Sequence, residues 1–227
     1  IKQDNLSETT KGKPDFVWIK DRSNSYNHEL YDTTRGALNR LTAENDVEDQ
    51  INDGLQKFLK GGFSIEDRPG LNTNASNYIS WNWLANGGTT SANTDGSGAT
   101  TASVIQANQT AGFSIVTYTG TGSQTKIAHG LSKAPEWILI KNRTASGQNW
   151  HVYHKSLGAT HALFLGTSSG PSDSTEFMND VEPTSSVFTV NSSGGVNQST
   201  KTMLAYCWHS VEGFSKFGSY IANNNAD

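Results

Sequence analysis

The chain contains two short stretches in which every position is apolar. Residues 16–19 read Phe-Val-Trp-Ile and residues 137–140 read Trp-Ile-Leu-Ile, and charged residues bound both stretches. Strands with one solvated face alternate between apolar and polar residues, whereas strands covered on both faces are apolar throughout. The pattern therefore predicts two central strands, each covered by protein on two sides.

These two stretches belong to an internal repeat. Residues 14–22 (PDFVWIKDR) return as residues 135–143 (PEWILIKNR), and residues 79–83 (ISWNW) return as residues 204–208 (LAYCW). A duplicated module is more often a binding or building unit than a catalyst. The repeat therefore favours two similar modules over one enzyme domain.

Alternation along the second motif predicts a strand with one inward face in each copy. The positions that we expect in the core are Ile79, Trp81, Trp83, Leu204, Tyr206 and Trp208, together with the recurring pair Phe63 and Phe188. Further strands are predicted at 113–118, 151–153, 162–165 and 187–190. A hairpin-type turn is predicted at 191–195, after the last of these strands.

Two segments need separate interpretations. Residues 213–220 echo residues 112–118, which predicts a terminal strand that closes the second copy or begins a third. Apolar residues between Val47 and Leu59 follow helical spacing, with Gly61 placed as a C-cap. That spacing favours a local helix, whereas the family resemblance described below implies an extended loop at the same place.

The composition is that of a chain with short strands and many turns. Hydrophobic residues make up 34% and charged residues 17%, both below usual averages, while six Trp, nine Phe and seven Tyr argue against disorder. Residues 91–109 are rich in Gly, Ser, Thr and Asn and predict a linker, with at most a short edge strand at Val104 and Ile105.

The predicted fold is therefore all-β, with two tandem antiparallel β-sandwiches of jelly-roll or lectin-like type. The expected divisions are 1–90 for the first sandwich, 91–109 for the linker, 110–212 for the second sandwich and 213–227 for the terminal strand or the start of a further repeat. Ile1 is not a methionine, and we expect the chain to be a segment of a longer polypeptide.

Charge and cysteine content narrow the function. The net charge is −4 and no cluster of Lys or Arg occurs, so we expect no nucleic-acid partner. No apolar run reaches the roughly 18 residues that a membrane span needs, so we expect no membrane insertion. Cys207 lies in an apolar strand pattern and is expected to be a buried free thiol. We expect no metal and no cofactor.

Aromatic and histidine side chains are the candidate ligand-binding groups. Ring faces bury the C–H groups of sugars, while nearby polar groups bind the hydroxyls. The candidates are Trp150, His151, Tyr153 and His154 in the second copy, with Tyr26 and His28 in the corresponding stretch of the first. The alternative is that these rings pack between sheets.

Carboxylates offer a weaker case for catalysis. Glu29 with Asp32, and Glu176 with Asp180, are the pairs that a glycoside hydrolase would need, but they do not correspond between the copies. Asp32 and Arg35 lie in a turn that looks exposed, where a salt bridge would pin the loop. We therefore expect no catalytic residues.

The motifs taken in order resemble a known family. PDFVWIKDR, LYDTTRG, FLKGGFSI and NYISWNWLANGG, followed by AGFSIVTYTGTG, HGLSKAPEWILIKNR, WHVYHKSLG and AYCWHSVEGFSKFGSY, resemble repeat modules in virion proteins of marine tailed bacteriophages. Such modules are described as tail-fibre-like and are similar to concanavalin- and laminin-G-type β-sandwiches, which often bind glycans. The family supplies no catalytic or ligand-binding residues to carry over.

The resemblance implies a virion structural protein in a tail fibre or capsid surface appendage. Its expected partners are other virion proteins, copies of itself in a homo-oligomer such as a trimer, and a host surface glycan. Two alternatives stay open. One is a depolymerase with two carboxylates about 5–9.5 Å apart across a groove; the other is an architectural decoration or fibre-shaft module without a ligand.

Overall fold

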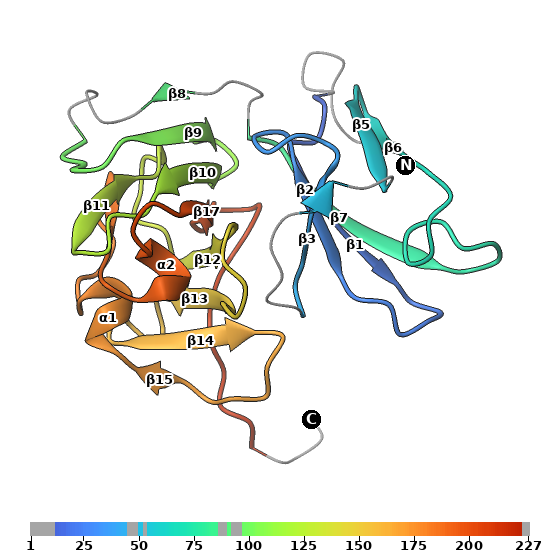
Figure 1. The fold of residues 1–227 in the computed structure, drawn as a ribbon. Coiled ribbons are helices and arrows are strands. Elements are labelled where there is room, and N and C mark those ends of the chain that lie inside the picture. The colour runs from blue at the N-terminus through green and yellow to red at the C-terminus, as the bar shows by residue number, and fades with distance from the viewer. Residues whose placement is uncertain (1–11, 45–49, 52–53, 86–89, 92–96, 224–227) are drawn as a thin grey trace.

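A computed structural model describes most of the chain, in the ranges 12–44, 50–51, 54–85, 90–91 and 97–223. The described chain is all-β, and every pair of neighbouring strands in its sheets runs antiparallel (Figure 1). Helix is limited there to two short segments, α1 (Thr175–Met178) and α2 (Gly194–Asn197). The predicted fold class is confirmed at this level.

The N-terminal repeat forms a five-stranded sheet in the order β4-β3-β2-β1-β7. The bounds of these strands are β1 (Phe16–Asp21), β2 (Glu29–Asp32), β3 (Asn39–Thr42), β4 (Gln50–Ile51) and β7 (Tyr78–Trp83). A separate hairpin, β5 (Leu55–Leu59) with β6 (Gly62–Ile65), supplies apolar side chains to one face of this sheet.

The rest of the chain forms an eight-stranded sheet in the order β15-β14-β13-β12-β17-β10-β9-β8. Its strands are β8 (Thr90–Ser91), β9 (Ser103–Asn108), β10 (Phe113–Thr119), β12 (Trp137–Asn142), β13 (Trp150–His154), β14 (His161–Leu165), β15 (Ser172–Asp173) and β17 (Thr202–Trp208). A second pair, β11 (Thr125–Ala128) with β16 (Val187–Val190), packs on one face of it. Strand β9 lies within the segment where the sequence predicts a linker.

The strand order repeats as the sequence does. The order β4-β3-β2-β1-β7 in the first copy corresponds to β15-β14-β13-β12-β17 in the second. The same irregular backbone hydrogen bond recurs at the start of each central strand, where Asp15 N–H donates to Trp83 O and Glu136 N–H donates to Trp208 O. The copies differ beyond the last shared strand. In the second copy the sheet extends from β17 to β10, β9 and β8, whereas among the described residues no strand pairs with the outer edge of β7.

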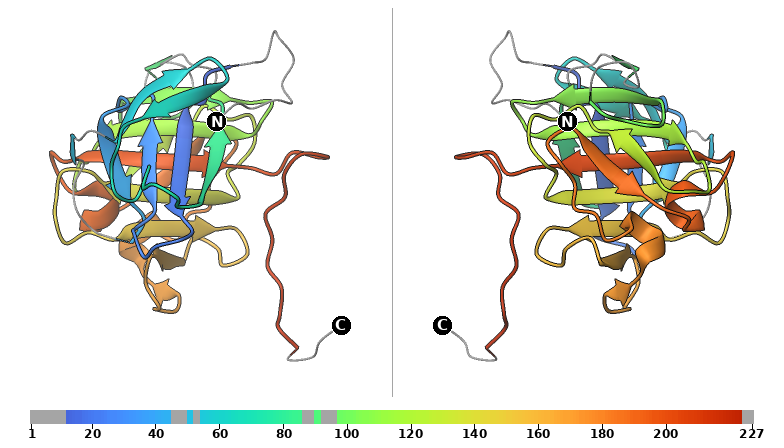
Figure 2. Two further views of the ribbon diagram at one scale, coloured as in Figure 1. Left: turned by 90° about the vertical axis from the view of Figure 1, so that its right-hand side faces the viewer. Right: turned by 90° about the vertical axis from the view of Figure 1, so that its left-hand side faces the viewer.

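Four layers stack on one another. The β5–β6 hairpin covers one face of the five-stranded sheet, whose other face packs against the eight-stranded sheet, and β11 with β16 covers the far face of that sheet. The strands of the two large sheets run crosswise to each other (Figure 2). The two repeats therefore share one apolar layer, which contains Phe16, Leu30, Phe113, Tyr206 and Trp208.

The two fully apolar stretches are confirmed as central strands covered on both faces. Strand β1 places Val17 and Ile19 in the layer under the hairpin and Phe16 in the layer between the sheets. Strand β12 likewise places Ile138 and Ile140 on one side and Leu139 on the other, each fully buried.

Several local predictions are wrong. Residues 55–59 form strand β5 and not the end of a helix, because the Leu55 side chain fills the layer against Val17; the proposed start of that helix, residues 47–49, lies outside the described residues. The turn at 191–195 does not make a hairpin, since β16 and β17 belong to different sheets and α2 connects them.

The predicted terminal strand also fails to form. Residues 213–220 make one isolated bridge, between Val211 and Ser215, and Phe214 and Tyr220 are largely exposed.

On β7, Ile79 and Trp81 are 39% and 40% exposed, although their alternation predicted an inward face. The counterparts Leu204, Tyr206 and Trp208 and the residue Phe188 are buried as predicted, whereas Trp83 and Phe63 are half-buried.

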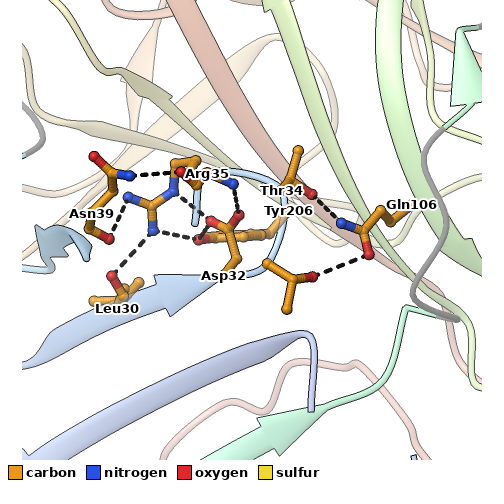
Figure 3. A network of polar contacts seen from close by, with 8 residues as sticks. Leu30, Asp32, Thr34, Arg35, Asn39, Gln106 and Tyr206 are labelled. Carbon is orange, nitrogen blue, oxygen red and sulfur yellow. Dashed lines mark hydrogen bonds and ion pairs between the residues drawn. The ribbon is translucent and has the colours of Figure 1, made fainter. Parts of the chain in front are cut away.

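A polar network joins the two repeats inside the shared layer (Figure 3). The Arg35 Nε donates to Asp32 Oδ2 at 2.5 Å, and both side chains are fully buried. Tyr206 Oη of the other sheet donates to the same Asp32 oxygen at 2.7 Å. Arg35 also donates to the backbone oxygens of Leu30 and Asn39, so the prediction of an exposed turn at this place is wrong.

A second polar contact lies beside the first. Gln106 on β9 donates to Thr34 Oγ1 at 2.8 Å and accepts from Thr33 Oγ1 at 3.2 Å (Figure 3). Thr33 and Thr34 belong to the turn after β2, whereas Gln106 belongs to the segment where a linker was predicted. Strand β9 is therefore tied to both sheets.

Two buried histidines lie in the C-terminal half. His129 Nδ1 accepts from Leu131 N–H, its Nε2 lies 3.1 Å from Thr184 O, and burial lowers the pKa of this imidazole to about 4. Burial likewise lowers the pKa of His151 to about 4, aided by the Lys141 ammonium and opposed by a contact to Asn149 O. Both rings are therefore neutral in the folded protein at neutral pH.

Replacement of Asp32 tests the network between the repeats. Asp32→Asn removes the buried counter-charge of Arg35 and should lower the free energy of unfolding by about 3–5 kcal/mol, because one buried charge then loses its partner. Tyr206→Phe should cost about 1–2 kcal/mol. The matched control is Lys155→Ala, which removes the exposed ion pair with Glu136 and should cost less than about 1 kcal/mol. Urea unfolding of the three variants measures these differences, and equal costs for Asp32→Asn and Lys155→Ala would contradict the assignment.

Acid should weaken the fold in a defined pH window. The unfolded chain takes up protons on His129 and His151 below a pKa near 6.5, whereas the folded chain resists until about 4. The free energy of unfolding should therefore decrease as pH falls from 6.5 towards 4. The decrease should be about 1.4 kcal/mol for each histidine and each pH unit. Urea titrations at pH 7.5, 6.0 and 5.0 check this, and His151→Gln should reduce the slope. A stability that stays constant over this range would disprove it.

Candidate functional site

Three aromatic side chains form a partly exposed surface on the N-terminal repeat, which we call the indole patch: Trp18 on β1, His28 just before β2 and Trp81 on β7. The Trp18 and Trp81 rings meet edge to face with centroids 6.0 Å apart, and the His28 ring stacks on Trp81 at 6.3 Å with an interplanar angle of 14°. Trp81 and Trp18 are direct neighbours in the β1–β7 register.

The crosswise packing of the two sheets explains why this patch reaches solvent. The register makes Trp18 the counterpart of Leu139 and Trp81 the counterpart of Tyr206, and both counterparts are fully buried between the sheets. Phe16, two residues before Trp18, is buried in that same layer. The patch therefore begins where the cover given by the second sheet ends.

Hydrogen bonds fix the orientation and the protonation state of the His28 ring. Trp18 Nε1 donates to His28 Nδ1 at 2.8 Å, so Nδ1 carries no proton in this arrangement. Burial lowers the pKa of His28, and the Lys20 ammonium lowers it further, while the Glu44 carboxylate opposes the shift. The Glu44 side chain accepts from His28 N–H and lies 3.5 Å from Nε2. A neutral ring therefore stands between an indole and a carboxylate.

Lys20 shapes the loop beside the patch. Its Nζ donates to Tyr26 O at 2.6 Å and to Asp21 O at 2.8 Å, which holds the chain between β1 and β2. Tyr26 itself is 43% exposed. Chemically, the patch offers an exposed indole and a carboxylate that accepts hydrogen bonds, a combination suited to the C–H face and the hydroxyls of a sugar.

The residues predicted from the sequence do not form one site. Trp150 is fully buried and its Nε1 donates to Thr42 O of the other repeat, while Tyr153 Oη donates to Glu182 inside the second repeat. His151 is also buried, between Phe164 and Phe177. Of the second-copy set, His154 alone is partly exposed. Packing between sheets, the alternative interpretation, therefore describes Trp150 and Tyr153, whereas His151 is buried under helix α1.

In the first copy, the structure places His28 in the indole patch, whereas the exposed Tyr26 side chain lies against Gly70 and only its backbone oxygen is bonded to Lys20. Sequence reasoning missed Trp18 and Trp81 because a repeat shows which side chains share a sheet face and not whether another layer covers that face. One signal was available in the sequence. The second copy has Leu139 and Tyr206 at the positions where the first copy has Trp18 and Trp81, and this difference between the copies indicates that the two faces have different surroundings.

The predicted carboxylate pairs do not converge on a shared groove. The Glu29 carboxylate accepts a hydrogen bond from Tyr31 Oη and forms ion pairs with Arg40 and Arg68. Asp32 instead points into the layer between the two large sheets, where Tyr206 donates to it. Glu176 and Asp180 are exposed. Among the residues that the structure describes, no cluster of three or more His, Cys, Asp or Glu side chains could hold a metal ion.

The remaining expectations concern the thiol and the membrane. Cys207 is fully buried, and burial raises the pKa of its thiol well above the ordinary value. Within the described parts of the chain, none of the helices is long and apolar enough to cross a bilayer.

Comparison with known proteins gives one match. The model of a family described as a domain of unknown function, DUF7483, matches residues 3–227. No curated protein and no solved structure matches the chain. Because the family match spans nearly the whole sequence, from the first repeat to the end of the tail after β17, the chain belongs to the DUF7483 family.

Proposed function

We propose that this chain is a structural module of a bacteriophage virion, in a tail fibre or a surface appendage, and that it contributes to attachment by binding a host surface glycan. The resemblance of its ordered motifs to virion repeat modules supports the virion role. The observation that carries the glycan-binding role is the indole patch, where Trp81 presents 40% of its surface to solvent beside His28 and Glu44.

We also propose that each repeat is a lectin-like sandwich. Copies of the chain form a homo-oligomer, and this homo-oligomer binds other virion proteins. In support, each large sheet carries a two-stranded layer on its outer face, the β5–β6 hairpin in the first copy and β11 with β16 in the second. The sandwiches pack on each other through the faces that contain Phe16 and Tyr206, and the patch lies on the Phe16 face where the cover of the second sheet ends.

The geometry of the patch suits one class of ligand best. An indole face stacks on the apolar face of a pyranose ring, and a carboxylate beside it accepts hydrogen bonds from sugar hydroxyls. The neutral His28 ring and the nearby Lys20 carry little net positive charge against Glu44. We therefore expect neutral or weakly charged polysaccharides to bind better than highly anionic ones.

Replacement of Trp81 tests the glycan role. On an array of bacterial surface polysaccharides, the native chain should bind at least one glycan, and Trp81→Ala should weaken that binding about tenfold or more because the stacking face is lost. Trp81→Phe should recover part of the affinity. The matched control is Tyr220→Ala, which removes another exposed aromatic ring far along the tail and should leave binding unchanged.

Urea unfolding of the same variants separates lost binding from lost folding. Trp81→Ala should retain a cooperative transition, since the side chain is substantially exposed. If the native chain bound no glycan on the array, or if Trp81→Ala and Tyr220→Ala bound equally well, the glycan role would be refuted and a purely architectural role would stand.

The virion role has an independent test. An antibody against this chain should label intact phage particles from an infected host in immuno-electron microscopy, on the tail fibre or another surface appendage. Mass spectrometry of purified particles should give its peptides in several copies per particle. Detection of the chain in infected cells but never in purified particles would overturn the virion role.

A further inference from the structure

Strand β7 forms an open edge of the five-stranded sheet. Among the described residues, β7 pairs with β1 on one side and has no strand on the other. Its sequence, Tyr-Ile-Ser-Trp-Asn-Trp, contains no charged residue and no proline, and Ile79 and Trp81 are about two-fifths exposed. Exposed edges of this kind are templates for pairing with another chain, and proteins commonly protect them with Lys, Pro or a bulge.

Hydrogen bonding defines which groups this edge offers. Arg22 N–H donates to Asn77 O, so alternation along the antiparallel ladder directs the peptide groups of Ile79, Trp81 and Trp83 towards β1. The peptide groups of Tyr78, Ser80 and Asn82 therefore point away from the sheet. No hydrogen bond from those outward groups to any described backbone group occurs.

The second repeat shows what occupies the equivalent edge. There β17, the counterpart of β7, pairs along its full length with β10, which begins Phe113-Ser114 directly after Gly112. Phe113 lies opposite Trp208, and their ring centroids are 5.0 Å apart. The described part of the first repeat contains no equivalent of β10.

The tail after β17 carries the sequence of such a strand. Residues 213–220 begin Gly213-Phe214-Ser215, as the segment that leads into β10 begins Gly112-Phe113-Ser114, and yet they form no strand in the structure. Figure 2 shows the tail projecting away from the body of the molecule. Phe214 is 69% exposed and Ile221 97% exposed. A ring contact between Phe217 and Trp137, the Val211–Ser215 bridge and a hydrogen bond from Phe217 N–H to Ser210 Oγ hold its start.

We propose that the tail of one copy of this chain adds to β7 of a second copy as an antiparallel strand. Transfer of the β10–β17 register places Phe214 opposite Trp83, Lys216 opposite Trp81 and Ser219 opposite Tyr78. Phe214 then contacts Trp83 as Phe113 contacts Trp208, and the Lys216 ammonium lies near the exposed Trp81 indole. The occupant is a second copy because the Phe217–Trp137 contact keeps the tail at the end of its own β12, and the tail projects from the body instead of pairing with its own β7 (Figure 2).

The contact joins two different surfaces, the edge of one copy and the tail of the next. Such head-to-tail contacts build a ring when the rotation between copies closes and an open filament when it does not. For this pairing Ser215 and Phe217 exchange their hydrogen bonds to Val211 and Ser210 for main-chain bonds to Asn82 and Ser80 of the second copy, and the pair of Ser219 with Tyr78 adds to them. This inference shares Trp81 with the proposed glycan site, but its tests involve no glycan, so either proposal can fail without the other.

Mixed cross-linking tests both the partner and the register. In the proposed ladder Ile79 faces Gly218 in a non-hydrogen-bonded pair, with Cα atoms about 4.5 Å apart, within the range that a disulfide bridges. Chains with Ile79→Cys mixed with tagged chains with Gly218→Cys should form a mixed disulfide dimer under mild oxidation. The native Cys207 is buried and should not react. Val104→Cys, at a position of equal exposure on β9, is the matched control and should give at least tenfold less mixed dimer.

Proline substitution tests the same contact without a covalent trap. Ser219→Pro removes the tail N–H that would donate to Tyr78 O and should weaken self-association in sedimentation velocity at least tenfold. Ala222→Pro lies outside the paired register and should associate as the native chain does. The proposal is overturned if Ile79→Cys and Val104→Cys give equal amounts of mixed dimer. It is also overturned if chains that carry both Ile79→Cys and Gly218→Cys form a disulfide only within single chains. A native chain that stays monomeric at all concentrations overturns it as well.

Discussion

A strand without a polar face must be covered twice, and this requirement determines how the layers are arranged. Strand β1 buries Val17 and Ile19 on one side and Phe16 on the other, and β12 does the same with Ile138 and Leu139. One cover comes from within each repeat, from a two-stranded layer. The other cover comes from the opposite repeat, so each copy completes the core of its neighbour.

The crosswise orientation of the sheets then determines what remains outside. Two crossed sheets overlap over part of their area, and side chains on the same face can end up in the core or in solvent. Phe16 and Trp18 show this difference although they are two residues apart on the same face of β1. Phe16 is fully buried and Trp18 is half-buried. The indole patch is thus a consequence of architecture. Its chemistry comes from His28 and Glu44, whose positions in the second repeat hold Trp150 and Gly166.

Much of the fold could be predicted from the sequence, because the relevant signals are local. The apolar stretches at β1 and β12, the duplicated motifs and the all-β composition depend on neighbours along the chain. Burial of Asp32 and Arg35 could not be predicted, because it depends on Tyr206, more than 170 positions away in the sequence. Trp81 and Trp150 were misplaced for the same reason: one was expected in the core and the other at a ligand site, and the position of the opposite sheet decides both.

The buried Asp32–Arg35 pair, closed by Tyr206, has a consequence for the history of the chain. Duplication produces two modules that can in principle be separated, shuffled or lost one at a time. Once a charge pair of one module is shielded by a side chain of the other, deletion of either module leaves polar and apolar surface without its cover. The two repeats of this chain therefore depend on each other for cover, and a change that removes one of them also exposes the other.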